Sequence, residues 1–138
     1  MFDRAAPLFA RDFMLLKVIS TGWLVAMIVL HTTQDQVHTW TIAAVLSIAM
    51  NSTYIWAAYR SDYALKIESF VAAFLIGLTV AGLWVSPWLI IAGIFGHGAW
   101  DLAKHVGHGV PFFRWYTLGC VTADWSYGVA LTAHLVLS

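Results

Sequence analysis

At 138 residues, the chain is 61% hydrophobic and only 10% charged, with a mean hydropathy of +0.78. Soluble domains are on average about half apolar and about a quarter charged, so this composition excludes an ordinary soluble protein. The seven basic and seven acidic residues balance and form no basic run. The chain therefore lacks the electrostatic footprint of a nucleic-acid-binding protein.

Residues 1–12 mix charged and aromatic side chains without a small-residue cleavage signature, so we expect them to lie at a membrane interface rather than to form a removable signal peptide. Five apolar stretches follow, at about 13–30, 40–59, 67–85, 88–106 and 112–137. Each has roughly the twenty residues that a helix needs to cross the bilayer core. The predicted fold is therefore all-α: a single domain, 1–138, that forms an integral membrane bundle of five transmembrane helices.

The breaks between these stretches carry residues that end and begin helices. Segments 31–39 and 60–63 are polar or charged. Ser86 and Pro87 supply an N-cap followed by a proline at the first helical position, which predicts a tight turn between the third and fourth helices. Residues 107–111 supply glycines and then a second proline, which we expect to begin the fifth helix.

The orientation follows from the positive charges, because short cytoplasmic loops are enriched in lysine and arginine. With five spans, all seven basic residues fall toward one side of the membrane: Arg4, Arg11, Lys17, Arg60, Lys66, Lys104 and Arg114. We therefore predict a multi-pass protein of the bacterial inner membrane with its N-terminus in the cytoplasm and its C-terminus outside.

Small residues mark the expected packing surfaces, because they let helix backbones approach closely in a membrane. Ala73, Gly77 and Ala81 recur every fourth residue on the third helix. The fourth helix contains a second set of small residues: Ala92, Gly93, Gly96, Gly98 and Ala99. We expect the fourth helix to be central.

The candidate site is a stripe of ionisable residues on the fourth and fifth helices. His97, Asp101 and His105 are spaced at i, i+4 and i+8, which places them on one face, and Cys120 and Asp124 are also four apart. The two helices should be antiparallel neighbours. At about 1.5 Å per residue, His97 and Asp124 then lie at one depth of roughly 15 Å, and Asp101 and Cys120 at roughly 9 Å.

An ionised group in hydrocarbon costs several kcal/mol unless it is paired, protonated or bound to a metal. The stripe therefore predicts either a proton-sharing network or a metal site, and mixed imidazole and carboxylate ligands suit zinc or iron. The candidate ligands are His97, Asp101, His105, Asp124 and the softer Cys120, and the candidate catalytic residues are Asp101 and Asp124. The alternative is that these groups only hydrogen-bond one helix to the next.

Other polar residues stand at similar depth. The first helix carries Ser20 and Thr21, the second carries Asn51 and Ser52, and we expect the third to contribute only Thr79.

A second cluster is expected on the outer side, where His31, His38 and His134 fall near helix ends with Asp35. Three imidazoles suit copper or zinc, and an axial pair suits haem, although a histidine at the interface needs no ligand because its polar tip reaches water. The aromatic residues beside the stripe, Trp100, Tyr116, Trp125 and Tyr127, are typical of packing as well as of a lipophilic pocket.

The segment from His97 to Asp124 resembles a pattern in small bacterial multi-pass membrane proteins of unassigned activity: His-x-x-Trp-Asp, a histidine, Val-Pro, an aromatic residue, then Cys and Asp on the next helix. The resemblance covers the last third of the chain and implies a shared site without a substrate.

Three functions fit these observations. The first is a small membrane enzyme whose metal activates water or oxygen against a lipophilic substrate. The second is a non-catalytic accessory subunit of a larger respiratory, photosynthetic or monooxygenase complex, and the third is a proton or small-solute pathway. The expected partners are membrane lipids and either further copies of the chain or other membrane subunits.

Overall fold

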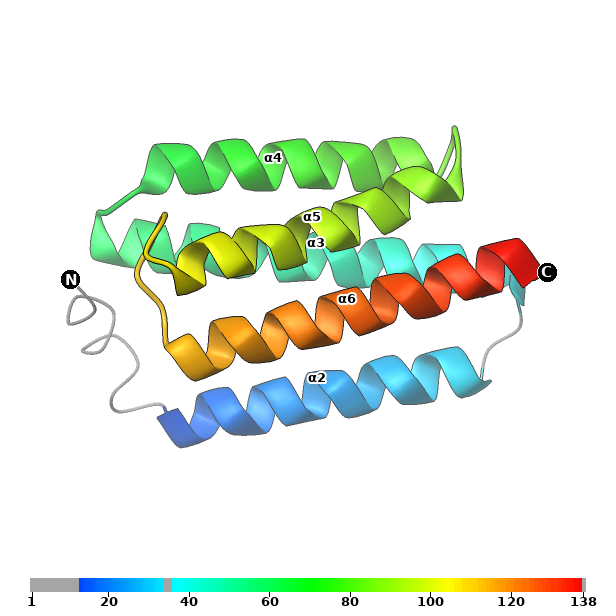
Figure 1. The fold of residues 1–138 in the computed structure, drawn as a ribbon, viewed down its shortest axis with the longest axis horizontal. Coiled ribbons are helices and arrows are strands. Elements are labelled where there is room, and N and C mark those ends of the chain that lie inside the picture. Colours follow the sequence, from blue (N-terminus) through cyan, green and yellow to red (C-terminus); the bar gives the residue numbers. More distant parts are fainter. Residues whose placement is uncertain (1–12, 34–35, 138) are drawn as a thin grey trace.

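The computed structural model describes residues 13–33 and 36–137, which form five α-helices and no strand. The helices are α2 (Phe13–Thr33), α3 (Gln36–Ser61), α4 (Leu65–Gly82), α5 (Pro87–His105) and α6 (Arg114–Leu137). They lie side by side and alternate in direction (Figure 1), so the predicted all-α class is confirmed. The predicted interfacial segment 1–12 and Asp35 lie outside the described residues.

Two of the described helices are long and apolar enough to cross a membrane, over His38–Ser61 and Leu65–Gly82. A buried core helix of a soluble protein passes the same test. Length and composition alone therefore support two crossings, fewer than the five that the sequence predicts.

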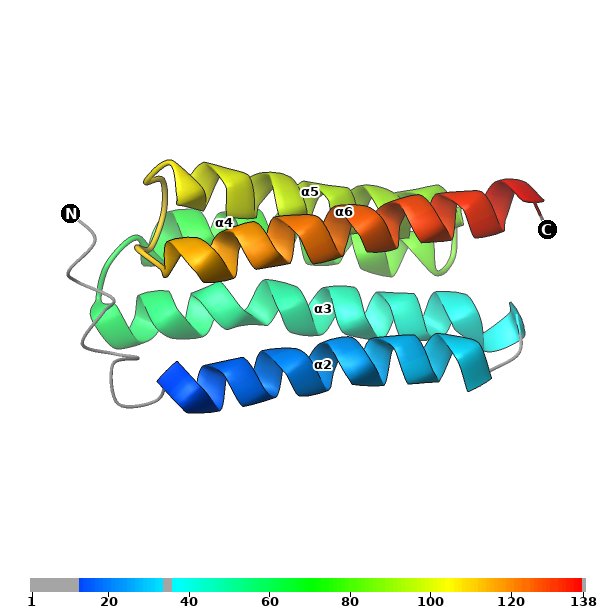
Figure 2. The same cartoon turned by 60° about the horizontal axis from the view of Figure 1, so that its bottom comes forward.

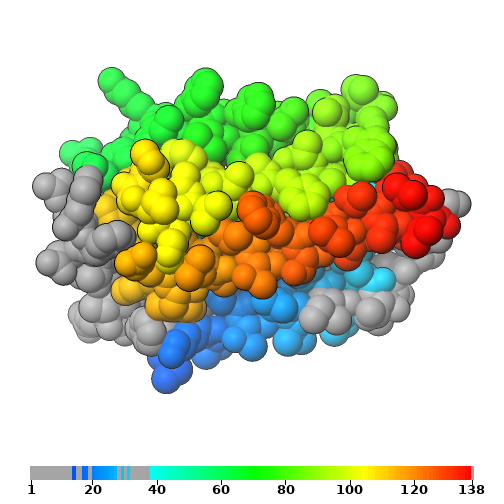
Figure 3. Space-filling model, viewed as in Figure 1, coloured from blue at the N-terminus to red at the C-terminus, as the bar shows by residue number. Residues whose placement is uncertain are grey.

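Helix α5 is central, as expected, because it packs against α3, α4 and α6. Figure 2 shows α2 beside α3 at one side of the bundle, and its contacts are mainly with α3. Figure 3 shows α4, α5 and α6 exposed next to one another on one face, in green, yellow and orange to red.

The glycines of α5 let its neighbours approach closely. A Cβ added at Gly93 would lie 2.6 Å from Thr79 Oγ1, and one added at Gly98 would lie 2.6 Å from the Trp125 ring. The predicted packing stripe on α4 is wrong, because Ala73 and Gly77 are exposed and a Cβ at Gly77 would meet nothing within 4 Å. Helix α4 instead buries its opposite face: Glu68, Ala72, Leu75, Thr79 and Gly82.

The helix ends follow the predicted breaks with two differences. Pro87 is the first residue of α5 and Ser86 holds the N-cap position, but the Ser86 side chain makes no capping hydrogen bond. Helix α6 begins at Arg114 rather than at residue 112, so Pro111 does not start it. Val110 and Phe112 are buried because this segment turns inward and packs against α3.

The bundle buries several charged side chains beside its apolar core and exposes many large apolar side chains. The largest fully buried side chains include Lys104, Glu68 and Asp101. Large apolar side chains are exposed on every described helix, among them Phe70 (70%) and Trp84, which follows α4 (85%). Charged residues are almost never fully buried in soluble proteins unless they are paired, and extended apolar surfaces mark contact with a partner or a membrane.

Candidate metal centre and adjoining cavity

Helices α5 and α6 bring His97 and Asp124 together in the interior of the bundle. His97 Nδ1 and Asp124 Oδ2 are 2.8 Å apart and form a hydrogen bond that the carboxylate accepts. Both side chains are buried. The predicted match in depth between these two residues is therefore confirmed.

Asp101 lies one turn further along α5 and completes a group of three. Its Oδ2 atom is 3.6 Å from His97 Nδ1. Potential ligand atoms of His97, Asp101 and Asp124 all lie within 4.8 Å of one another. Two ligand atoms bonded to one zinc ion at about 2.0–2.2 Å lie closer together than this limit, so the three residues could hold a metal ion after a small inward movement of their side chains.

Tyr54 on α3 is a fourth member of the site that the sequence analysis missed. Its hydroxyl donates to Asp101 Oδ1, and its ring stacks on His97 at 5.9 Å between centroids. The signal was the spacing of Ser47, Asn51, Tyr54 and Ala58, which marks the buried face of α3 by its small and polar residues.

Two buried polar atoms of the site have no hydrogen-bond partner: His97 Nε2 and Asp101 Oδ2. An unsatisfied buried group costs about 1–3 kcal/mol, and such groups in a native structure call for a ligand, a water or a catalytic role.

The other predicted ligands lie apart from this group. His105 contacts Thr117 Oγ1 at 3.4 Å and Arg114 at 3.3 Å, at the end of α5. Cys120 does not join the group of ligand atoms, although it lines a cavity with His97 and Asp124. Of the five predicted ligands, the structure brings together three: His97, Asp101 and Asp124.

The polar residues expected at the same depth have other partners. Asn51 donates to the Ser47 carbonyl at 2.8 Å, and the Ser47 and Thr79 hydroxyls are 2.8 Å apart. Ser52 donates back to the Ile48 carbonyl on its own helix. The contact between Ser47 and Thr79 joins α3 to α4, the other two lie within α3, and none of the three extends the site.

The third predicted span contributes more than Thr79, because Glu68 on α4 is fully buried and pairs with Lys104. Glu68 also accepts from Trp100 Nε1 at 3.0 Å and from the Val110 backbone N–H at 2.6 Å. Lys104 is therefore an interior charge rather than the loop charge that the orientation argument counted. Its Nζ atom also lies 4.1 Å from the centre of the Tyr54 ring.

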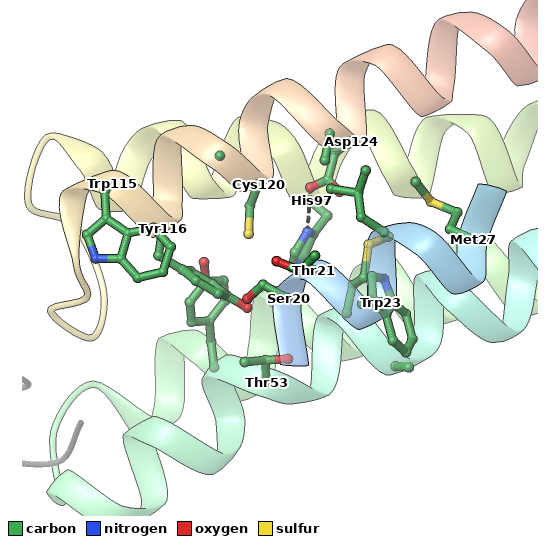
Figure 4. Close-up of a pocket in the computed structure, with 16 residues that line it drawn as sticks. Ser20, Thr21, Trp23, Met27, Thr53, His97, Trp115, Tyr116, Cys120 and Asp124 are labelled. Atoms are coloured by element: carbon green, nitrogen blue, oxygen red, sulfur yellow. Dashed lines mark hydrogen bonds and ion pairs between the residues drawn. The ribbon is translucent and has the colours of Figure 1, made fainter. Parts of the chain in front are cut away.

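A cavity of about 370 Å³ adjoins the site between α2, α3 and α6. Figure 4 shows the Cys120 sulfur directed into it from α6, Ser20 and Thr21 facing it from α2, and Thr53 facing it from α3. Trp115 and Tyr116 stand at one end, and Trp23 and Met27 at the other. His97 and Asp124 lie in its wall, so the candidate metal centre is in contact with this space.

The outer histidines do not gather into a metal cluster within the described part of the chain. His31 Nε2 hydrogen-bonds the Tyr127 hydroxyl, and the His134 ring packs on Trp40 at 5.8 Å. His38 is exposed. Of the aromatic residues beside the stripe, Tyr116 lines the cavity, while Trp100 and Trp125 bond to Glu68 and to the Phe95 carbonyl.

Comparison with family models, curated proteins and solved structures returns no match.

Proposed function

We propose that the chain is an integral membrane protein in which all five described helices cross the bilayer, with the N-terminal side in the cytoplasm. The apolar exterior supports this proposal, because it surrounds an interior that holds Glu68, Lys104, Asp101 and other polar residues. Charge distribution supports it too. Arg60, Lys66 and Arg114 lie at one end of the bundle, around the α3–α4 turn and the start of α6.

Within this bundle, we propose that His97, Asp101 and Asp124 bind one divalent transition-metal ion, zinc or iron. One imidazole and two carboxylates are ligands that both metals accept. A bound cation would also offset the charge of two buried carboxylates, which is costly in a medium without water. The unpartnered Asp101 Oδ2 would then gain the partner that it lacks in the described structure.

The function that this arrangement supports best is that of a metal-dependent enzyme acting on a lipophilic substrate. A bound metal would polarise a substrate oxygen or activate water. The second oxygen of Asp101 or Asp124, which would not be bound to the ion, would accept a proton. The observation that carries the proposal is the contact between a three-residue ligand group, with two unpaired buried atoms, and a cavity with largely apolar walls.

Metal content tests the first half of the proposal. The wild-type protein, purified in mild detergent without chelators, should contain about one zinc or iron per chain by elemental analysis. His97→Ala and Asp101→Asn should each lose the metal, whereas His134→Ala, a histidine on the same helix as Asp124 but outside the ligand group, should retain it. A metal-free wild type, or metal retained in His97→Ala, would contradict the assignment.

Catalysis can be tested without a known substrate. Purified protein is incubated with a lipid extract from its own host membrane, and the products are compared by mass spectrometry. We expect at least one lipophilic species to be consumed by the wild type and not by Asp101→Asn. Identical lipid profiles for the two proteins would contradict an enzymatic role.

A proton pathway is the second candidate, because buried polar groups continue from the end of α5 to the site. Lys104 lies over the Tyr54 ring, Tyr54 donates to Asp101, and Asp101 adjoins His97. Chains of histidine and aspartate are the usual proton relays inside membranes. Proton flux into liposomes that is abolished by Asp101→Asn would favour this function over the enzyme.

A further inference from the structure

The cavity beside the candidate metal centre has the dimensions of a site for one small molecule. Its volume of about 370 Å³ falls near the lower end of the range of roughly 300–1,000 Å³ for ligand pockets. A two-chain phospholipid is too large for such a space. One apolar chain or a compact lipophilic molecule fits it.

The walls select against a charged headgroup. Leu24, Met27 and Met50 provide apolar surface, and the lining residues in the described part of the chain include no lysine or arginine. Phosphate and sulfate groups are recognised mainly by arginine and lysine. A phosphorylated lipid would therefore have no counter-charge here.

Polar groups that could bind an uncharged oxygen are present on the cavity walls. His97 lies between Asp124 and Thr21 (Figure 4), and its Nε2 atom is fully buried without a partner. The hydroxyls of Ser20, Thr21 and Thr53 face the same space. A ligand hydroxyl placed among these side chains could both donate and accept a hydrogen bond.

We propose that this cavity binds a single-chain lipid that ends in a hydroxyl group, with the hydroxyl among Ser20, Thr21 and Thr53 beside the candidate metal centre and the chain along Leu24, Met27 and Met50. This inference deepens the proposed enzymatic function by naming its substrate class, and it rests on that function for the reaction. The binding itself depends only on the cavity and on the hydroxyl groups of its wall.

Gly119 provides a way to close the cavity without disturbing the bundle. It lines the cavity on α6, it is exposed, and a Cβ added to it would meet no atom within 4 Å. A leucine at this position should therefore extend into open space at the cavity wall. Gly77 on α4 offers a matched control, because it is also helical, exposed and open but does not line the cavity.

The experiment uses a dodecanol that carries a diazirine at mid-chain, added to the purified wild-type protein and cross-linked by light. Peptide mass spectrometry should locate the label on Met27 and Met50. Because the oxygen contributes about one hydrogen bond, unlabelled dodecanol should compete about fivefold to tenfold better than dodecane. Gly119→Leu should lose most of the label at these two residues, and Gly77→Leu should keep it.

Thr21→Phe fills the cavity from the opposite wall and should lose the label as Gly119→Leu does. Label that persists at Met27 and Met50 in both filled variants would overturn the inference, as would equal competition by dodecanol and dodecane. Metal content measured on the same samples separates the two proposals. A metal-free wild type with specific labelling would refute the metal site and uphold the cavity, whereas bound metal without competition would refute the cavity alone.

Discussion

Tyr54 is the residue through which α3 contacts the candidate metal centre. From α3, it donates a hydrogen bond to Asp101 on α5 and stacks on His97, while Lys104 lies over its ring. Groups that hydrogen-bond a metal ligand fix the orientation of that ligand. The tyrosine hydroxyl therefore holds one Asp101 oxygen and leaves the other directed at His97.

Tyr54→Phe removes this hydroxyl and keeps the ring. We expect the affinity for the bound metal to fall about tenfold to a hundredfold, the usual effect of losing a group that orients a ligand. The measurement is competition against a chelator of known affinity. Tyr59→Phe, an exposed tyrosine on the same helix, is the matched control and should bind as the wild type does. Equal affinities in both variants would show that Tyr54 does not position Asp101.

Glu68 and Lys104 form a buried ion pair whose carboxylate is fully used, since Lys104, Trp100 and the Val110 backbone all donate to it. Removing one partner of a buried pair leaves an uncompensated charge, which costs more than the pair itself contributes. The pair also holds the α5–α6 connection against α4, because Val110 belongs to that connection.

Lys104→Met should therefore lower the free energy of unfolding by about 3–5 kcal/mol. The double variant Glu68→Gln with Lys104→Met should recover part of that loss, because glutamine carries no charge and its one amide oxygen still accepts from either Trp100 or Val110, which bond to different oxygens of Glu68. Reversible unfolding in mixed detergent micelles, applied to both single variants and the double variant, gives the coupling energy. Additive losses would show that the two charges do not interact in the folded protein.

At the level of single helices, the sequence pattern predicts the depth of a residue along its helix better than it predicts which side chains that residue contacts. The i, i+4 spacing and a comparison of depths were enough to pair His97 with Asp124, because helical rise and antiparallel packing are regular. Tyr54 and Glu68 were missed because their burial depends on how α3 and α4 are rotated about their axes, and mixed apolar sequences with small amphipathic differences leave that rotation undetermined. The same uncertainty reversed the packing face assigned to α4.

The glycines of α5 and α4 test this difference between buried and exposed helix faces. Gly93→Ala would bring its Cβ within 2.6 Å of Thr79 Oγ1 and 3.3 Å of the Leu75 carbonyl oxygen, and overpacking of this kind costs about 1–3 kcal/mol. The Cβ that Gly77→Ala adds meets no atom within 4 Å. The substitution should stabilise the helix by about 0.5–1 kcal/mol, because alanine lowers the backbone entropy of the unfolded chain. The melting temperature measured in detergent should fall for Gly93→Ala and rise for Gly77→Ala. A stabilised Gly93→Ala would contradict the close approach of α5 to α4.

For the whole molecule, the strongest argument for a membrane is the contrast between its surface and its interior. The exposed side chains include Phe70, Phe74 and Trp88, while Lys104, Glu68 and Asp101 are almost completely buried. Water would favour the opposite arrangement, because apolar area transferred into water costs about 25 cal/mol per Å². In the proposed membrane location, hydrocarbon around the bundle would remove that cost and would account for the burial of these charged groups.

Because successive helices run in opposite directions, the two ends of the bundle should lie on opposite sides of the membrane. His108 lies in the α5–α6 connection and Val85 in the α4–α5 connection, both are exposed, and α5 runs between them. In a background with Cys120→Ala, which removes the only native cysteine, Val85→Cys should react with a membrane-impermeant maleimide in intact spheroplasts. His108→Cys should react only after the membrane is permeabilised, because the basic residues place its side in the cytoplasm. Labelling of His108→Cys but not of Val85→Cys in intact spheroplasts would show the opposite orientation. Release of the chain by an alkaline carbonate wash would refute the membrane-spanning bundle. The apolar surface would then be a contact for other proteins.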